Sequence, residues 1–190
     1  MRIILASQSP RRRELLERMG VAEFDIIPAQ GEEVMDPSLS PDRLVEELSR
    51  QKCAEVAAAH PDGLVIAADT VVSVGGLVLG KPHSREEAVS MLRRLSGREH
   101  RVHTAVQILS PAGSRSLVST AEVHFAPMTD REIEWYVSTG EPMDKAGAYG
   151  IQGYACRYIT GIRGDYYTVM GLPVQMLYRA LCDLGILGEN

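Results

Sequence analysis

The sequence predicts an α/β protein built on a mixed sheet, and three observations lead to that fold class. Short apolar runs typical of buried strands recur along the chain. Between them lie longer segments in which apolar residues have helical spacing, most of them opening on a serine or threonine cap. A short hairpin pattern and two long consecutive strand-like stretches complete the mixture.

The first sixty residues predict two strands and two helices. Each strand is a short apolar run. Each helix begins with serine followed by proline, because serine is a good N-cap and proline suits the first helical position. In order, these elements are a strand at 2–6, a helix from Ser9-Pro10 to Gly20, a strand at 24–28, a polar loop at 29–39 and a helix from Ser40-Pro41 to about Ala59.

The middle of the chain predicts a buried strand, a hairpin and a third helix. Residues 64–68 are continuously apolar, as expected for a central strand that is covered on both faces. Gly75-Gly76 between two apolar runs is typical of a two-residue hairpin turn. Ser84 and Glu87 have the spacing of a capping box. We therefore predict strands at 64–68, 71–74 and 77–79 and a helix from Ser84 to Gly97.

The last ninety residues predict three strands and two helices. From Leu117 to Phe125 apolar residues alternate with polar ones, so that Glu122 and His124 lie on the outer face. Thr129 begins a helix with a second capping box. The predicted elements are strands at 101–109, 117–125 and 158–162 and helices from Thr129 to Gly140 and from Pro173 to Leu184.

Composition limits the class of protein. A chain of 190 residues with 45% hydrophobic and 24% charged residues predicts one soluble domain over 1–190. The net charge of −5 argues against broad nucleic-acid binding. The cysteines Cys53, Cys156 and Cys182 form no C-x-x-C pair, which predicts buried thiols in a reducing compartment. No apolar run suits a signal peptide or a membrane span, so we expect a cytoplasmic protein with no membrane partner.

Residues 144–153, with the sequence DKAGAYGIQG, form the most unusual segment of the chain. Its three glycines cost backbone entropy and leave little to pack, so neither a helix nor a strand is expected. A segment of this kind between ordered elements suits close approach of backbone and polar side chains to a ligand. A plain glycine-rich connector is the alternative.

Three arginines, Arg11, Arg12 and Arg13, occupy the first turn of the first predicted helix. Positive charges oppose the helix dipole there, whereas a bound anion would benefit from the dipole, the free N–H groups and the guanidinium groups together. A solvated basic patch is the alternative. Neither a Walker A string nor a dinucleotide-binding fingerprint is present.

Carboxylates and lysines elsewhere suit phosphate chemistry. Asp69, after the apolar strand, could act as a general base or hold a divalent metal, or it could merely cap the next turn. Glu33 in the polar loop could supply a second carboxylate, or be plain surface charge. Lys52 lies near an apolar helix face, Lys81 stands between glycine and proline, and Lys145 lies in the glycine-rich segment. Together with the arginines, these lysines would suit a triphosphate.

The motifs in order resemble the Maf family of nucleoside triphosphate pyrophosphatases. The resemblance covers nearly the whole chain, and the complete series is far more specific than any one member. It comprises Leu5-Ala6-Ser7-x-Ser9-Pro10-Arg11-Arg12, Glu33, Lys52, Ala68-Asp69-Thr70, Gly80-Lys81-Pro82, Gly97-x-x-His100, the segment 144–153 and Gly171-Leu172-Pro173.

The resemblance implies hydrolysis of a nucleoside triphosphate to the monophosphate and pyrophosphate, with Mg²⁺ or Mn²⁺ as cofactor. By family similarity Asp69 is the proton acceptor, with Lys52, Lys81 and Glu33 also catalytic, and Glu33 and Asp69 hold the metal. The substrate-binding residues so implied are Ser7, Arg11, Arg12, Thr70, Lys145 and Gln152.

Arg12, Thr70 and Gln152 resemble the specificity set of the branch that acts on dTTP and UTP, and the branch that acts on 7-methyl-GTP differs there. A glutamine amide can pair with both the donor and the acceptor of a thymine or uracil edge. The cellular role so implied is removal of non-standard pyrimidine nucleotides or an influence on cell division. A regulator that binds nucleotide or a partner protein without hydrolysis, and a modified-base pyrophosphatase, are the alternatives.

The resemblance also implies the fold shared with inosine triphosphate pyrophosphatases, which is an elongated mixed sheet with flanking helices and two lobes around a cleft. Homodimers are common in the family, although no feature of this sequence predicts one by itself. Three positions depart from the family pattern: Thr168 stands in place of asparagine, Cys53 in place of alanine and Ala105 in place of glycine.

Overall fold

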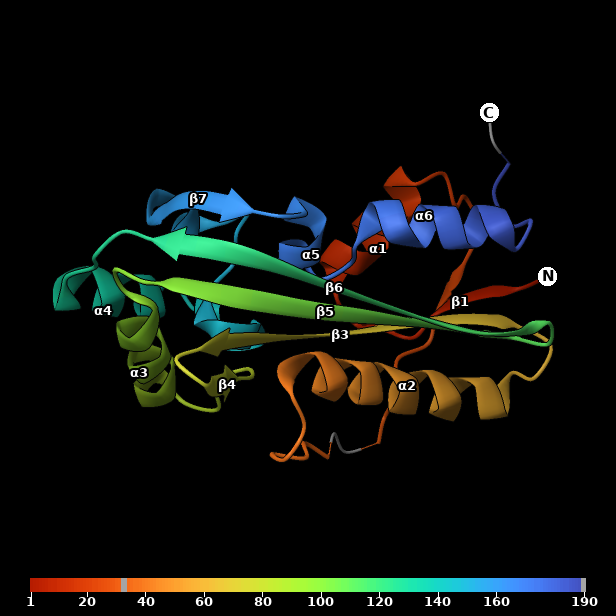
Figure 1. Ribbon diagram of the computed structural model, residues 1–190, viewed down its shortest axis with the longest axis horizontal. Coiled ribbons are helices and arrows are strands. Elements are labelled where there is room, and N and C mark those ends of the chain that lie inside the picture. Colours follow the sequence, from red (N-terminus) through yellow and green to blue (C-terminus); the bar gives the residue numbers. More distant parts are fainter. Residues whose placement is uncertain (32–33, 189–190) are drawn as a thin grey trace. The chain divides into compact units, whose positions relative to one another are not determined.

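A computed structural model describes residues 1–31 and 34–188 (Figure 1). Its sheet has seven strands: β1 (Ile3–Leu5), β2 (Asp25–Ile26), β3 (Leu64–Val74), β4 (Leu77–Leu79), β5 (Glu99–Ser110), β6 (Gly113–Phe125) and β7 (Ile159–Arg163). Their order is β2-β1-β3-β5-β6-β7, with β4 paired to β3. Because β1 runs parallel to β2 and β3 while β4 and β7 pair antiparallel, the sheet is mixed, which confirms the predicted class.

The helices are α1 (Pro10–Arg18), α2 (Pro41–Ala59), α3 (Arg85–Leu95), α4 (Asp130–Ser138), α5 (Tyr166–Met170) and α6 (Val174–Asp183). Three 3₁₀ turns, η1 (Glu141–Asp144), η2 (Ala146–Ala148) and η3 (Tyr154–Arg157), occupy and flank the glycine-rich segment. That segment contains neither an α-helix nor a strand, as predicted.

The chain forms two compact units. Unit 1 comprises Met1–Asp69, Thr104–Ser119 and Gly171–Asn190, and unit 2 comprises Thr70–His103 and Thr120–Met170. The strands β3, β5 and β6 each contribute residues to both units. Two units agree with the two lobes that the family resemblance implies.

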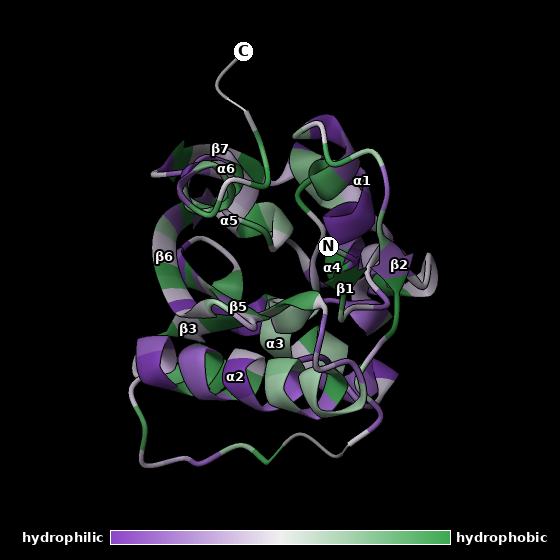
Figure 2. Cartoon of the chain, turned by 90° about the vertical axis from the view of Figure 1, so that its right-hand side faces the viewer, coloured by the Kyte–Doolittle hydropathy of each residue, from purple (hydrophilic) through white to green (hydrophobic). Residues whose placement is uncertain are grey.

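In unit 1 the sheet has α2 on one face and α1 and α6 on the other (Figures 1 and 2). Ile4 and Ala6 of β1 form a buried cluster with Val65 and Ala67 of β3 and Cys53 of α2. Figure 2 shows hydrophilic and hydrophobic bands along α2, as expected for a helix that packs one stripe on the sheet and leaves the other in water.

The core of unit 2 is rich in aromatic side chains. Leu92 of α3, Val123 and Phe125 of β6, and Tyr136 of α4 lie in one buried cluster with Tyr149 of the glycine-rich segment. The helix α3 packs against both α4 and η2. The glycine-rich segment is therefore part of the core of this unit at Tyr149, although most of its residues have little to bury.

The starts of the helices were predicted more accurately than the hydrogen bonds that cap them. Ser84 and Thr129 cap α3 and α4 through their side chains, and Thr129 with Glu132 forms a complete capping box. Ser9 and Ser40 stand at the predicted starts of α1 and α2, but the prediction that their side chains cap is wrong. The proline that follows each serine already fixes the first helical φ, so these helices begin without that bond.

The helix α5 was not predicted. It begins just after Asp165, whose Oδ2 accepts hydrogen bonds from the Thr168 N–H at 2.9 Å and from Thr168 Oγ1 at 2.8 Å. Thr168, which departs from the family pattern, is thus a fully buried residue that secures the start of this short helix. Cys53 and Ala105, the other two departures, are core residues.

The three cysteines are free thiols, but only one is fully buried. Cys53 lies in the core, its Sγ donates to the Val65 carbonyl at 3.4 Å, and burial raises its pKa to about 12. Cys156 is exposed and Cys182 is partly exposed. The prediction that all three are buried is therefore wrong for Cys156, which lies in the η3 turn at the surface.

Candidate functional site

Asp69 is an interior residue of β3, and the prediction that it follows the end of a strand is wrong. The predicted strands at 64–68 and 71–74 are one strand, because β-branched residues continue through Thr70, Val71 and Val72 and β4 pairs with the second half. Side chains of a strand alternate between faces, so Asp69 shares its face with Val65 and Ala67. Helix α2 covers that face.

Lys52 of α2 meets Asp69 there. Lys52 Nζ and Asp69 Oδ1 form an ion pair, with the two side chains only 18% and 10% exposed. The sequence prediction placed Lys52 near an apolar helix face, and its neighbour Cys53 does pack in the core on β3. A buried ion pair adds little net stability, because desolvating both charges offsets most of their attraction. The pair is therefore better explained by a role in a reaction than by a contribution to the stability of the fold.

Arg12 holds three backbone segments of unit 1 together. Its Nε donates to the Gly171 carbonyl at 2.8 Å, and its Nη1 donates to the Ala68 carbonyl at 2.7 Å. Nη1 also lies 3.4 Å from Ser7 Oγ, which accepts the Ser9 N–H at 3.2 Å. The guanidinium fork thus ties the loop after β1 to β3 beside Asp69 and to the segment before α6.

Four predicted site residues of unit 1 are therefore linked. Ser7 and Arg12 are joined directly, Arg12 contacts the residue before Asp69, and Asp69 is paired with Lys52. Arg11 precedes Arg12 in the first turn of α1. The family resemblance implies that Arg12 binds the substrate, but nothing in a linear pattern predicts that its guanidinium also binds the carbonyls of residues 68 and 171.

The other predicted site residues that the structure describes belong to unit 2. Thr70 lies in β3, and the exposed Lys81 follows β4. Gly147 N–H donates to the Gly80 carbonyl at 3.0 Å, which joins the glycine-rich segment to the Lys81 turn. Gly147 has φ +68°, and a Cβ there would lie 2.8 Å from Val72 Cγ2, so this contact with β3 needs glycine.

Lys145 is held within its own segment. Its Nζ lies 2.8 Å from the Glu141 carbonyl oxygen and 2.6 Å from Asp144 Oδ1, and its side chain is 15% exposed. The predicted role in substrate binding stays a prediction. Gln152, in contrast, is exposed. It lies in a turn that is closed by the Gly153 N–H, which donates to the Gly150 carbonyl at 3.2 Å.

Tyr149 anchors the glycine-rich segment in the core of unit 2. Its Oη lies 2.8 Å from His100 Nε2, and the rings of Tyr149, His100 and Phe125 meet edge to face with centroids 4.8–5.2 Å apart. Burial is the main cause that lowers the pKa of His100 to about 4, and burial also raises the pKa of Tyr149. His100 is therefore neutral at physiological pH. It was predicted only as part of a motif, with no contact assigned.

The predicted metal ligands are Glu33 and Asp69. Glu33 lies outside the described residues, so its placement is not part of this structure. Asp69 offers a buried carboxylate, which is the hard oxygen donor that Mg²⁺ and Mn²⁺ prefer, and Mg²⁺ is commonly bound by one or two carboxylates together with substrate phosphates. The donor chemistry at Asp69 thus fits the predicted ion.

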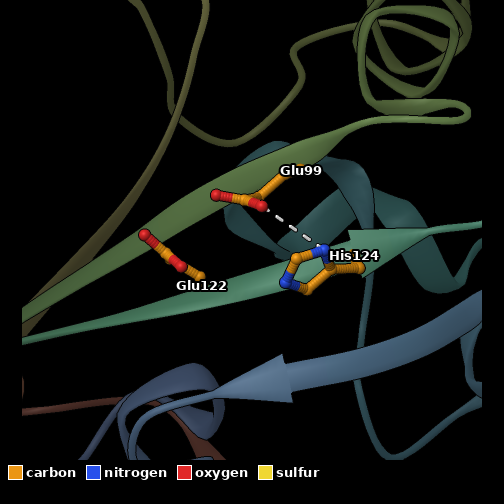
Figure 3. Close-up of side chains that lie close together, drawn as sticks. All are labelled: Glu99, Glu122 and His124. Carbon is orange, nitrogen blue, oxygen red and sulfur yellow. Dashed lines mark ion pairs between the residues drawn. The ribbon is translucent and has the colours of Figure 1, made fainter.

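A second group of metal-capable side chains lies in unit 2 (Figure 3). It comprises Glu99, Glu122 and His124, with His124 Nδ1 3.5 Å from Glu99 Oε2. The carboxylate of Glu122 already faces two guanidinium groups, Arg101 at 3.2 Å and Arg163 at 3.4 Å. These two ion pairs account for the position of Glu122, and we assign the group no metal.

Comparison with known proteins gives consistent results. A family model described as "Maf: Maf-like protein" matches residues 2–184. A relative from Bacillus velezensis named dTTP/UTP pyrophosphatase is 50% identical, covering 97% of each chain. Another of that name, from Carboxydothermus hydrogenoformans, is 50% identical and covers 97% of this chain and 100% of the relative.

Solved structures show the same fold at much lower identity. A HAM1 protein from Coxiella burnetii has a TM-score of 0.55 at 16% identity, covering 96% of this chain and 99% of that chain. The Staphylococcus aureus Ham1 protein has a TM-score of 0.55 at 15% identity, covering 97% and 100%. The fold class predicted from the sequence is thereby confirmed. Among the described residues, no helix combines the length and apolarity that spanning a membrane requires.

Proposed function

Because the chain belongs to the Maf family, we propose that it is a nucleoside triphosphate pyrophosphatase that prefers dTTP and UTP. The products would be the nucleoside monophosphate and pyrophosphate. The observation that carries the proposal is the buried ion pair of Lys52 and Asp69, next to the backbone that Arg12 holds. The names of the relatives support the same reaction and the same substrates.

In the proposed reaction a water molecule attacks the α-phosphorus. Its oxygen forms a bond to phosphorus, the bond from that phosphorus to the bridging oxygen breaks, and the electron pair leaves on pyrophosphate. Asp69 accepts the proton of the water, and Lys52 beside it stabilises negative charge at the reaction centre. Mg²⁺ or Mn²⁺, held by Asp69 and by Glu33 as the resemblance implies, would neutralise charge on the phosphate oxygens.

The preference for dTTP and UTP is assigned to Gln152, with Thr70 and Arg12. Gln152 is exposed in its turn, so its amide is available to a base edge. The amide carries both a donor and an acceptor, which match the acceptor and the N–H donor of uracil and thymine. Lys81 and Lys145 are proposed to neutralise the triphosphate, together with Arg11. By the family resemblance we also propose a cytoplasmic enzyme that forms homodimers.

The test is turnover of a panel of nucleoside triphosphates with Mg²⁺ or Mn²⁺, followed by chromatography of the products. We expect monophosphate and pyrophosphate from dTTP and UTP, with little product from purine nucleotides or 7-methyl-GTP. Release of single phosphate would refute the pyrophosphatase reaction. Nucleotide binding without turnover by a folded protein would instead favour a regulator, for which the buried Lys52–Asp69 pair has no evident use.

A further inference from the structure

A closed set of hydrogen bonds surrounds the turn that carries Gln152. The Gly150 N–H, at the start of the turn, donates to Tyr136 Oη at 3.1 Å. The Tyr136 hydroxyl donates to Glu141 Oε1 at 2.7 Å. The other carboxylate oxygen, Glu141 Oε2, accepts the Tyr154 N–H at 2.9 Å, just after the turn. One tyrosine and one carboxylate thus bind both ends of the turn.

The glycines of the turn fit this arrangement closely. A Cβ at Gly153 would lie 2.1 Å from Glu141 Oε2, so the carboxylate occupies the space that any other side chain would need. A Cβ at Gly150 would lie 2.6 Å from Lys145 Cε. Lys145 in turn donates to the Glu141 carbonyl at 2.8 Å. The absence of side chains at 150 and 153 therefore lets Glu141 and Lys145 lie directly against the backbone of the turn.

Tyr136 and Glu141 are themselves well fixed. Tyr136 is fully buried in the core of unit 2, and its ring meets Tyr158 edge to face. Burial, followed by the bond to Glu141, raises the pKa of Tyr136 well above its ordinary value, so the hydroxyl remains a donor throughout the physiological range. The Glu141 N–H donates to Thr139 Oγ1 at 3.2 Å. The turn is thus tied to α4 and η1.

We propose that Tyr136 and Glu141 are positioning residues for base selection, which hold the turn Gly150–Gly153 in the one orientation that presents the Gln152 amide to a pyrimidine edge. The proposal deepens the function proposed above and rests on it. Two hydrogen bonds to a base require the amide plane to be aligned in advance. A turn that rotates freely would let Gln152 contact many bases and discriminate among none.

The decisive measurement is the ratio of kcat/KM for UTP to kcat/KM for ATP. A variant that merely lowers the fraction of folded enzyme lowers both values equally and leaves the ratio unchanged. Glu141→Gln keeps the size of the side chain but leaves only one acceptor oxygen. The Tyr136 hydroxyl and the Tyr154 N–H each need one, so one of these two hydrogen bonds is lost. Tyr136→Phe removes the acceptor of Gly150. We expect each to lower the ratio about 3- to 10-fold, the effect of one lost hydrogen bond.

Two controls make the result specific. Glu134→Gln changes an exposed carboxylate on the same helix as Tyr136 and should leave the ratio unchanged. Gln152→Ala removes the proposed reader itself. In that background Glu141→Gln should cause no further loss of selectivity, because the two residues act through one contact. Independent and additive losses in the double variant would overturn the proposal, as would an unchanged ratio in both single variants.

A second measurement separates this proposal from the proposed function. Amide hydrogen exchange at Gly150 and Tyr154 in the nucleotide-free protein should become faster in Glu141→Gln. Unchanged exchange would mean that Tyr136 and Glu141 do not hold the turn in place. If the wild type turns over no nucleotide, the enzyme proposal fails, and the affinities of the same variants for UTP and ATP are compared instead. Equal discrimination in wild type and variants would then refute the positioning role.

Discussion

Lys52 and Asp69 form a buried ion pair within unit 1. The two residues are seventeen positions apart in the sequence and come from the helix α2 and the strand β3. Replacing Asp69 by asparagine keeps its shape and one acceptor for Lys52, but removes the basic carboxylate. We predict that Asp69→Asn lowers kcat by about 10²–10⁴-fold, the usual contribution of a general base. The measurement is turnover of dTTP, with circular dichroism as the check on folding.

Asp62→Asn is the matched control, because Asp62 is exposed in the turn after α2. It should retain the turnover of the wild type. A folded Asp69→Asn protein with full activity would remove Asp69 from the mechanism.

Arg12 should be sensitive even to lysine. Its guanidinium contacts the carbonyls of Gly171 and Ala68 through two different nitrogens, and a lysine ammonium cannot span both. We predict that Arg12→Lys lowers the free energy of unfolding by about 1–3 kcal/mol, since one buried carbonyl loses its donor. Urea denaturation measures the effect. Arg13→Lys, which alters only an exposed pair with Glu17, should change stability by less than about 0.5 kcal/mol.

Two glycines with almost the same backbone angle offer a matched comparison. Gly147 has φ +68° and Gly185 has φ +69°, but a Cβ at Gly147 would meet Val72 at 2.8 Å whereas Gly185 has open space. Gly185→Ala should therefore cost only the backbone strain, about 1 kcal/mol. Gly147→Ala should cost roughly 1–3 kcal/mol more, because it adds overpacking. Equal losses in thermal unfolding would mean that the contact with Val72 is easily relieved.

The buried His100 predicts a specific loss of stability in acid. Its pKa is about 4 in the folded protein against 6.5 for an ordinary histidine, mainly because burial disfavours the charged ring. Below pH 6.5 the unfolded chain binds a proton that the folded chain does not, so stability falls until the pH reaches about 4. The shift corresponds to a loss on the order of 3 kcal/mol across that range.

The measurement is urea denaturation at several pH values between 7 and 4. His100→Gln should unfold more easily at pH 7, because it loses packing against Phe125 and Tyr149, yet should lose less stability on acidification. His83→Gln changes an exposed ring and should keep the pH dependence of the wild type. If His100→Gln keeps it as well, another group causes the acid sensitivity.

The sequence predicted helices well where two independent signals coincided, as at Thr129 and Glu132, where a capping box precedes an apolar stripe. It failed at Asp69, because a polar residue inside an apolar run looks like the end of a strand unless its partner, Lys52, is known. The hydrogen bonds of Tyr136 and Glu141 were missed for a related reason. Nothing close to either residue in the sequence indicates a polar partner, and only the folded chain brings their polar atoms to Gly150 and Tyr154.

The division of the chain between the two units has a consequence for its synthesis. The chain passes between the units four times, and unit 1 includes Gly171, whose carbonyl Arg12 binds, and the helix α6. Unit 1 therefore cannot be completed on the ribosome until all of unit 2 has been translated. The residues of unit 2 can contact one another first. Arg12 can bind the Gly171 carbonyl only after nearly the whole chain has been translated.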